Sequence, residues 1–250
     1  MTQPGAGVRF EWGLAGAAEL SRVCGALVVV DVLSFTTAVT VAVERGFRVH
    51  PFPWNDQAEQ YAQRIGAAVA VGRSATSPGR PWSLSPSALR AAPVVPDLVL
   101  PSPNGATICA AAESSGIPVL AGCLRNAAAV AGLLRSDGYG TPEAPVGVVA
   151  AGERWPDGTL RPSVEDLLGA AAVLDGLTDG ELSVEAAAAV AVLYGVPDVP
   201  AAIRGCVSGR ELADQGFATD VDLAADRDSS SEVPVLRSGV FTGGRVARTR

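Results

Sequence analysis

The sequence predicts an α/β protein, a layered α/β/α sandwich around a largely parallel or mixed sheet. Short apolar runs alternate with alanine-rich stretches of helical length along most of the 250 residues. The run Ala26–Val30 is apolar at every position, which is typical of a parallel strand buried on both faces. Gly46 and Gly66 each follow a helical stretch, where a glycine commonly ends a helix. We expect one domain over residues 1–250, or two coupled lobes of this class.

The first part of the chain alternates most regularly. The apolar run that ends at Asp31 is followed by a helix that starts at Thr36 and ends before Gly46, and the next strand and helix repeat this pattern. A third apolar run leads into a stretch rich in Ser, Pro and Gly, whose length is typical of a functional or disordered loop. The expected strands are 26–30, 47–52 and 67–71, the helices are 36–45 and 57–65, and the long loop is 72–96.

The alternation resumes after the long loop. Short apolar runs predict strands, and the alanine-rich stretches that follow them predict helices. Two later stretches, 184–194 and 199–215, also have a helical composition. The tail from Asp220 is acidic and then rich in valine, and we expect it to add late strands. The expected strands are 97–100, 118–121 and 146–150, and the helices are 105–114, 126–135 and 163–177.

Composition excludes several classes of function. All 19 basic residues are arginine, against 26 acidic residues, so the net charge is −7 and no basic stripe favours binding to nucleic acid. Because the chain has no lysine, it cannot form a lysine Schiff base, attach pyridoxal phosphate or build a GK[ST] phosphate loop. His50 is the one histidine, and no GxSxG elbow is present to partner it in a catalytic triad.

Cysteine spacing and the N-terminus bear on where the protein works. Cys24, Cys109, Cys123 and Cys206 form no CxxC pair, so they favour buried thiols over a zinc or redox site. Reduced thiols and the lack of a signal-peptide pattern predict a cytoplasmic protein. No apolar stretch reaches the length of a membrane span, so no membrane partner is expected. The sequence does not determine the oligomeric state, and a homodimer is one candidate.

Polar residues follow four of the expected strands, at the sheet edge where open α/β folds bind ligands. Asp31 comes directly after a strand, where it either holds a metal, attacks a substrate or serves as a turn acid. Thr36 and Thr37 can cap the next helix and offer hydroxyl and amide donors to an anion. Asn104 and Gly105 form a tight turn that exposes backbone donors or acts only as a turn.

The third segment pairs a cation with an amide. Asn126 either caps the helix that it precedes or contacts a ligand. Arg125 beside it either binds an anionic group or is only solvated. Helix N-termini, amide donors and an arginine of this kind suit a phosphate group, whose ester Mg²⁺ would polarise.

The fourth segment is acidic. Ser163 and Asp166 resemble a capping box, and the helix dipole alone would favour Glu165 and Asp166 in a first helical turn. A functional role is favoured because Asp31, Glu165 and Asp166 would all lie along the same edge of the sheet. A small cluster of carboxylate oxygens suits Mg²⁺, so we expect these three residues to be both its ligands and the catalytic acids.

These motifs, together with a C-terminal run, occur in an order that resembles one known family. They are Val29 to Leu33 with Thr36–Thr37, Asn104–Gly105, Gly122 with Asn126–Ala127, Ala151–Gly152 through Glu165–Asp166, and Ser208–Gly209–Arg210 through Val233–Pro234. Over nearly the whole chain the set resembles the 2-phosphosulfolactate phosphatase family. The resemblance implies a layered α/β fold and a Mg²⁺-dependent hydrolase. Its substrate would be a small anionic phosphoester, 2-phospho-3-sulfolactate, cleaved to 3-sulfolactate and phosphate on the route to coenzyme M.

The sequence also departs from the family pattern. Ser34 and Phe35 stand where the family has an Arg-Ala pair, and Ala106 replaces a threonine. The loss of a basic residue beside the site would weaken binding of a substrate with two anionic groups. The insertion 153–162 brings Arg154 and Arg161, which we expect to replace the missing charge.

Two other functions stay open from the sequence. A haloacid dehalogenase-type phosphatase also places an Asp after its first strand, but it needs a second Asp where Leu33 stands, and a lysine. A non-catalytic or re-purposed anion-binding member of the same fold is favoured by the departures just described. The acids from Asp220 to Asp228 lack the glycine and closing glutamate of an EF-hand, so we interpret them as a solvated face.

Overall fold

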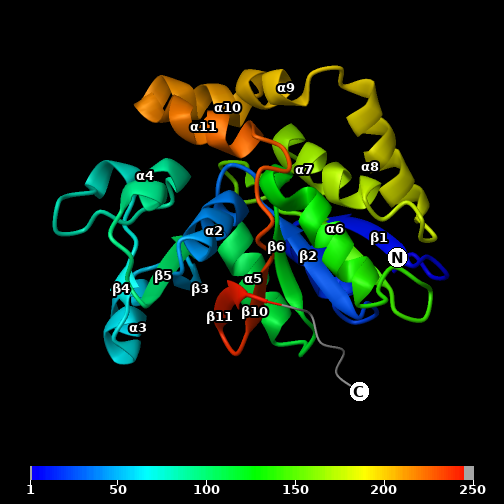
Figure 1. Cartoon of the computed structure of the whole chain (residues 1–250), viewed down its shortest axis with the longest axis horizontal. Coiled ribbons are helices and arrows are strands. Elements are labelled where there is room, and N and C mark those ends of the chain that lie inside the picture. The colour runs from blue at the N-terminus through cyan, green and yellow to red at the C-terminus, as the bar shows by residue number, and fades with distance from the viewer. Residues whose placement is uncertain (1, 245–250) are drawn as a thin grey trace.

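The computed structural model describes residues 2–244 and confirms the α/β fold class (Figure 1). Within those residues a nine-stranded mixed sheet is ordered β1-β7-β2-β6-β10-β11-β3-β5-β4, and β8 and β9 form a separate ribbon. The strands are β1 (Val8–Trp12), β2 (Ala26–Val30), β3 (Arg48–Pro53), β4 (Ala68–Val69), β5 (Asp97–Ser102), β6 (Val119–Gly122), β7 (Val146–Ala150), β8 (Glu153–Arg154), β9 (Leu160–Arg161), β10 (Pro234–Arg237) and β11 (Val240–Gly243). The α-helices are α1 (Gly13–Leu20), α2 (Phe35–Glu44), α3 (Gln57–Ile65), α4 (Pro86–Ala91), α5 (Gly105–Glu113), α6 (Ala127–Ser136), α7 (Val164–Asp175), α8 (Val184–Gly195), α9 (Val199–Gly205), α10 (Val207–Leu212) and α11 (Ala218–Ala225).

The sheet consists of two parallel halves joined by a hairpin. Strands β1, β7, β2 and β6 pair in parallel, and so do β3, β5 and β4. Between the halves lies the C-terminal hairpin, in which β10 pairs antiparallel with β6 and β11 pairs antiparallel with β3. The hairpin is the late pair of strands expected of the valine-rich tail, and it makes the sheet mixed.

The core divides along β2, because successive side chains of a strand point to opposite faces. Leu27 and Val29 pack in one cluster with α2, α5 and the second half of the sheet, and Val28 and Val30 pack in another with α6 and α7. Helices α2 and α5 pack over strands of both halves of the sheet and over the hairpin that joins them (Figure 1). All five residues of β2 are buried, as its uninterrupted apolar sequence predicted. This arrangement brings the N-termini of α2 and α5 to one place.

Several elements differ from the sequence expectation. Strand β1 and helix α1 were not expected, because β1 alternates apolar residues with Arg9 and Glu11 in place of an apolar run. Arg9 is buried all the same, since its guanidinium donates to the carbonyl groups of Thr2 and Ala6. The long loop 72–96 contains a 3₁₀ turn, η1 (Arg73–Ala75), and the short helix α4, whose N-cap Ser85 accepts a hydrogen bond from Ala88 N–H. The ribbon β8–β9 occupies the insertion.

The stretch expected as one helix over 199–215 is broken twice. The chain turns at Cys206, whose extended backbone ends α9 and starts α10, and its thiol accepts the Gly209 N–H. A π-helical turn, η3 (Ala213–Phe217), then contains Gly216 at φ 90°, a left-handed conformation that glycine adopts readily. These breaks fold the segment back on itself as the upper layer of Figure 1.

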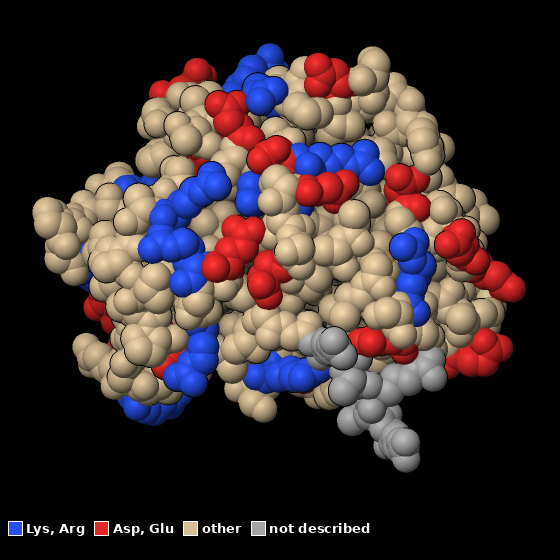
Figure 2. All heavy atoms as spheres, viewed as in Figure 1, with Lys and Arg blue, Asp and Glu red and all other residues tan. Residues whose placement is uncertain are grey.

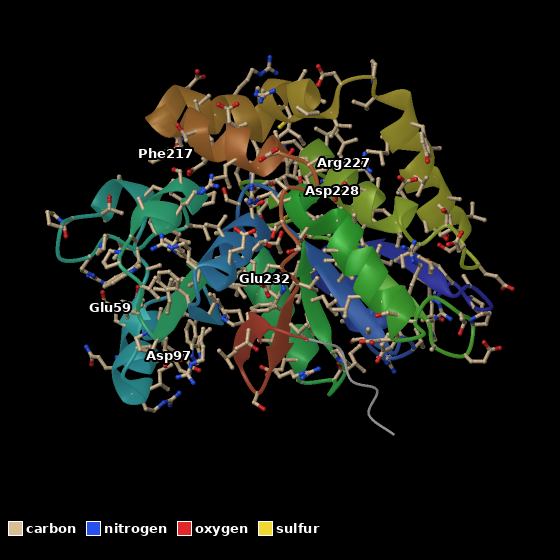
Figure 3. All side chains as sticks on the ribbon, in the orientation of Figure 1. Glu59, Asp97, Phe217, Arg227, Asp228 and Glu232 are labelled. Carbon is tan, nitrogen blue, oxygen red and sulfur yellow. The ribbon has the colours of Figure 1, made fainter. Side chains whose placement is uncertain are left out.

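The acidic run after η3 is not a uniformly solvated face, which corrects the sequence interpretation. Asp220 is fully buried, whereas Asp222 and Asp226 are exposed. Asp228, labelled in Figure 3 where the chain leaves α11, accepts the Ala128 N–H in the first turn of α6 at 2.8 Å. The residues that follow continue through Glu232 towards β10.

The surface carries charges of both signs, and the apolar helices are short. On the face drawn in Figure 2, arginines and acidic residues are interspersed. Among the exposed ion pairs, Arg204 Nε lies 2.6 Å from Asp222 Oδ1. No single helix among residues 2–244 is long and apolar enough to cross a bilayer. Helices α8 and α9 meet that test only when taken together, and they are bent by 94° at the break between them.

Candidate active site

A cleft of about 340 Å³ opens where β2 and β5 end and where the chain leaves β7. It lies next to the N-termini of α2 and α5, where the helix dipoles favour an anion. Its polar walls come from the loop after β2, the turn before α5, the β8–β9 ribbon and the long loop. The polar residues that line it include Asp31, Ser34, Arg73, Ser102, Asn104 and Glu153.

Asp31 follows β2 directly and is held by two backbone amides from different helices. Its Oδ1 accepts the Phe35 N–H at 3.1 Å, and its Oδ2 accepts the Gly105 N–H at 2.9 Å. The residue is 6% exposed. Burial raises the pKa of Asp31 and the nearby Glu165 carboxylate adds to this rise, while the two amide hydrogen bonds oppose it. The carboxylate is therefore fixed in orientation at the edge of the cleft.

Gly105 is required at this point because its neighbour is the Asp31 carboxylate. A Cβ on Gly105 would lie 2.7 Å from Asp31 Oδ2 and 2.6 Å from a ring carbon of Phe35. We expect Gly105→Ala to displace Asp31 and to lower the catalytic rate about 100-fold, as a shift of about 1 Å commonly does. The measurement is phosphate release beside thermal unfolding. Gly132→Ala is the matched control, since a Cβ on Gly132 in α6 meets nothing within 4 Å; the prediction is wrong if the two variants have equal activity.

Asp166, in the first turn of α7, joins two loops below Asp31. Its Oδ1 accepts the Val32 N–H at 2.7 Å, and its Oδ2 accepts the Gly152 N–H at 2.8 Å and the Ser163 hydroxyl at 3.0 Å. Burial raises the pKa of Asp166 well above its ordinary value, and the carboxylates of Asp31 and Glu165 add to this rise. The expected capping box is wrong, since Ser163 donates to Asp166 and makes no side-chain bond to the helix amides.

Glu153 is a site residue that the sequence analysis did not single out. It begins β8, it lines the cleft, and its Oε2 accepts the Asn104 amide at 2.9 Å. Burial raises the pKa of Glu153 to about 7; the Asp31 and Glu165 carboxylates also raise it, against the Asn104 hydrogen bond and Arg161. Glu153 comes three residues after the end of the predicted strand 146–150, and this place was a signal that could have found it.

The raised pKa of Glu153 gives a pH dependence of stability. Because the folded protein binds the Glu153 proton more tightly than the unfolded chain does, stability falls as pH rises from about 4.5 to about 7 and then levels off. We expect Glu153→Gln, in chelator, to unfold at the same temperature as the wild type at pH 4.5 and about 5 °C higher at pH 8. Thermal melts across this range test it. Glu59→Gln, at an exposed position, should show no such divergence.

The comparisons with known proteins bear on this site. The sequence matches the family described as 2-phosphosulpholactate phosphatase over residues 16–239. It is 32% identical over 218 residues to the 2-phosphosulfolactate phosphatase of Methanothermobacter thermautotrophicus, which covers 86% of this chain and 88% of the relative. The chain belongs to the 2-phosphosulfolactate phosphatase family. The resemblance drawn from the sequence motifs is thereby confirmed.

The structure brings part of the family motifs together at the cleft. Asp31, Asn104 and Gly105 meet there, as the sequence analysis expected. The Glu165 carboxylate raises the pKa of Asp31 and of Glu153, and the Asp31 carboxylate raises the pKa of Asp166. Neither Glu165 nor Asp166 is among the described residues that line the cleft. Glu165 is buried, and its carboxylate contacts the Cys206 thiol.

Four of the expected phosphate ligands have other partners. The hydroxyls of Thr36 and Thr37 donate to the backbone carbonyls of Asp31 and Val32. Asn126 bonds the Cys123 N–H through Oδ1 and the carbonyls of Ala121 and Glu232 through Nδ2. Arg125 pairs with Glu44, the last residue of α2, and with Asp226, and it donates to the Leu223 carbonyl. In this structure all four side chains serve the scaffold.

The two arginines of the insertion differ in whether they act on the site. Arg154 is exposed and donates to the Gly158 carbonyl within its own ribbon. Arg161 donates to the Ser208 hydroxyl at 3.3 Å, lies over the Trp155 ring and lowers the pKa of Glu153. Arg161 is therefore the member of the pair whose charge reaches the site.

The carboxylates of the cleft can be tested as ligands for Mg²⁺. Among residues 2–244, no three His, Cys, Asp or Glu side chains form a ready-made metal cluster. Mg²⁺ usually needs less than that, because it retains waters and takes one or two carboxylates together with substrate phosphate. Asp31 and Glu153 both line the cleft, and the Asp31 carboxylate raises the pKa of Glu153. A divalent cation would relieve this repulsion, so the residues present fit the ion.

Proposed function

We propose that the cleft hydrolyses a small anionic phosphate monoester, 2-phospho-3-sulfolactate, to 3-sulfolactate and phosphate. One observation carries the proposal: Asp31 is fixed by the Phe35 and Gly105 amides in a cleft that Glu153 and Asn104 also line. Membership of the phosphatase family and the name of the relative favour this substrate. Formation of 3-sulfolactate on the route to coenzyme M belongs to the same proposal.

We propose that Asp31 and Glu153 hold Mg²⁺. When bound, the ion would polarise the phosphoryl oxygens and lower the pKa of a bound water. Glu165 and Asp166, expected as ligands from the sequence, do not line the cleft, and we propose that they support it without binding the ion. Asp166 uses both oxygens on the Val32 and Gly152 amides, and so fixes the loop that carries Asp31.

Other groups around the cleft orient Glu153 and offset the negative charge of the phosphoryl group. Asn104 holds Glu153 through its amide Nδ2, which keeps that carboxylate directed into the cleft beside Asp31. The N-termini of α2 and α5 place partial positive charge where the phosphoryl group would lie. The ribbon β8–β9 supplies Glu153 and Arg161, and so forms one wall of the site. Electrostatic preorganisation of this kind is the main source of rate in phosphoryl transfer.

The experiment is a phosphate-release screen over sulfonated and carboxylated phosphoesters, with Mg²⁺ and with chelator. We expect release from 2-phospho-3-sulfolactate that requires Mg²⁺. Release from another ester alone would keep the chemistry and overturn the substrate. Thermal stabilisation by phosphate or sulfolactate, with no release from any ester, would favour the non-catalytic anion-binding alternative.

We place the reaction in the cytoplasm as part of the proposal. Cys24, Cys109, Cys123 and Cys206 are all free thiols and all buried, which is the pattern of a reducing compartment. Burial raises the pKa of Cys24 and of Cys206 to about 11, so these thiols stay protonated and unreactive at neutral pH.

A further inference from the structure

The cleft has one strongly placed cation that neither the motifs nor the proposed reaction has used. Arg73 begins η1 in the long loop and reaches the cleft beside Ser34. Of the described residues that line the cleft it is the one basic residue, and Asp31, Glu153 and Glu211 are acidic. A cleft with this balance needs Arg73 if it is to receive an anion.

Arg73 is held on three sides. Its Nε donates to Asp220 Oδ2 at 3.4 Å, and its Nη2 donates to the Ser34 hydroxyl and to the Leu84 carbonyl. The guanidinium carbon lies 5.4 Å from the centre of the Phe217 ring. Figure 3 labels Phe217 at the end of the upper layer that faces α4. The plane of the guanidinium is therefore fixed before any ligand binds.

One edge of the guanidinium is left over. No donor–acceptor contact joins Arg73 Nη1 to another group within residues 2–244, although the side chain is only 18% exposed. Nη1 is not among the buried side-chain atoms that lack a partner, so this edge is accessible, and Arg73 lines the cleft. A planar, fixed donor at the wall of a cleft is the geometry that recognises carboxylate, sulfonate or phosphate oxygens.

Asp220 is built to hold Arg73 in this position. It is fully buried, and its Oδ1 accepts the Ser85 hydroxyl at 2.7 Å, the Ser87 N–H at 3.1 Å and the Ser87 hydroxyl. The other oxygen, Oδ2, is left to Arg73. A buried ion pair of this kind is weak evidence for stability, since the cost of desolvation offsets the attraction. Its evident effect here is on the orientation of Arg73.

We propose that Arg73 binds an anionic group of the substrate and that Asp220 is the residue that positions it. The proposal rests on the proposed function and adds the residue that recognises the substrate's charge. It also accounts for Ser34: where a basic side chain beside Asp31 is absent, Arg73 supplies the charge from a distant loop and takes the Ser34 hydroxyl as a support.

The first test compares KM with kcat. Arg73→Ala should raise KM for 2-phospho-3-sulfolactate about 10- to 100-fold, the loss expected for one charge-assisted hydrogen-bonded pair, with a smaller change in kcat. Arg73→Lys should recover only part of the loss, because an ammonium cannot face Asp220 and the ligand with one rigid fork. Arg22→Ala, which removes an exposed arginine paired with Glu19, is the charge control and should leave KM unchanged.

A second substrate identifies which anionic group Arg73 binds. If KM for p-nitrophenyl phosphate rises equally in Arg73→Ala, Arg73 binds the phosphate; if only KM for 2-phospho-3-sulfolactate rises, it binds the sulfonate or carboxylate. Both results support an anion-binding role. Unchanged KM for both substrates in an active Arg73→Ala enzyme overturns the proposal.

The positioning role of Asp220 needs a double-mutant cycle. Asp220→Asn should raise KM about tenfold in the wild-type background and have no effect on KM in the Arg73→Ala background. Ser87→Ala removes a partner of Asp220 without touching Arg73, so it should lower the unfolding temperature with KM unchanged. Equal effects of Asp220→Asn on KM in both backgrounds would show that Asp220 does not act through Arg73.

A calorimetric arm separates this proposal from the proposed function. If the wild-type protein releases no phosphate from any ester, the proposed function fails, but sulfolactate binding still tests Arg73. Affinity for sulfolactate should fall about tenfold or more in Arg73→Ala and stay unchanged in Arg22→Ala. Equal affinity in the wild type and Arg73→Ala would overturn the anion-binding role independently of turnover.

Discussion

Replacing Asp31 by asparagine is expected to lower phosphate release roughly 10³-fold or more, the scale found when a group central to the reaction is removed. Asparagine has nearly the same shape, but it carries no charge to hold a cation or to face phosphorus. The Phe35 and Gly105 amides each donate to one oxygen of Asp31, and asparagine has a single oxygen, so its NH2 group would face one of these donors. The measurement is kcat with 2-phospho-3-sulfolactate and saturating Mg²⁺.

The fold should survive this change. Asp31→Asn removes a buried charge that Glu165 disfavours, which offsets the poorer hydrogen bonding. We therefore expect the unfolding temperature to stay within about 5 °C of that of the wild type. A protein that keeps its circular dichroism spectrum and also keeps its turnover would remove Asp31 from the reaction.

Replacing Asp166 by alanine is expected to have the largest effect on stability. The change leaves the Val32 and Gly152 amides and the Ser163 hydroxyl without their shared acceptor in a buried position. We expect a loss of about 2–4 kcal/mol of unfolding free energy, or roughly 10 °C in unfolding temperature. Activity should fall with it, since the same carboxylate fixes the loop that carries Asp31.

The control for Asp166 separates a structural role from metal binding. Ser163→Ala removes one of the three donors and should cost about 1 kcal/mol with little change in kcat. If Asp166→Ala were as stable as the wild type and lost only its affinity for Mg²⁺, Asp166 would be a direct ligand and the structural role assigned to it would be wrong. Thermal melts with and without Mg²⁺ distinguish the two.

The sequence could predict the parallel strands and Asp31 because both follow local rules. An apolar run such as Ala26–Val30 must be buried on both faces, and a polar residue at its carboxyl end then lies at the ligand-binding edge. The turn Asn104–Gly105 was accessible for the same reason. Membership of the family followed from the order of these motifs, and the comparisons confirm it.

The rest of the site depends on contacts that no local pattern shows. Arg73 lies in a loop of irregular sequence, and its orientation is set by Asp220, 147 positions later. Thr36, Thr37 and Asn126 have the side chains of phosphate ligands, but buried backbone groups next to them claim their hydrogen bonds. Which use a polar side chain serves is decided by what surrounds it after folding, so composition and spacing could not assign it.

The hairpin β10–β11 has a consequence for how the protein is made. Among residues 2–244 its strands come after all the others in the sequence, yet they pair with β6 and β3 and so join the two halves of the sheet. Until they are made, the nascent chain exposes an unpaired strand edge on each half, which is the kind of surface that aggregates or recruits chaperones. The sheet therefore becomes continuous only after β10 and β11 have been synthesised, and a chain cut just before β10 would lack the strands that join its two halves.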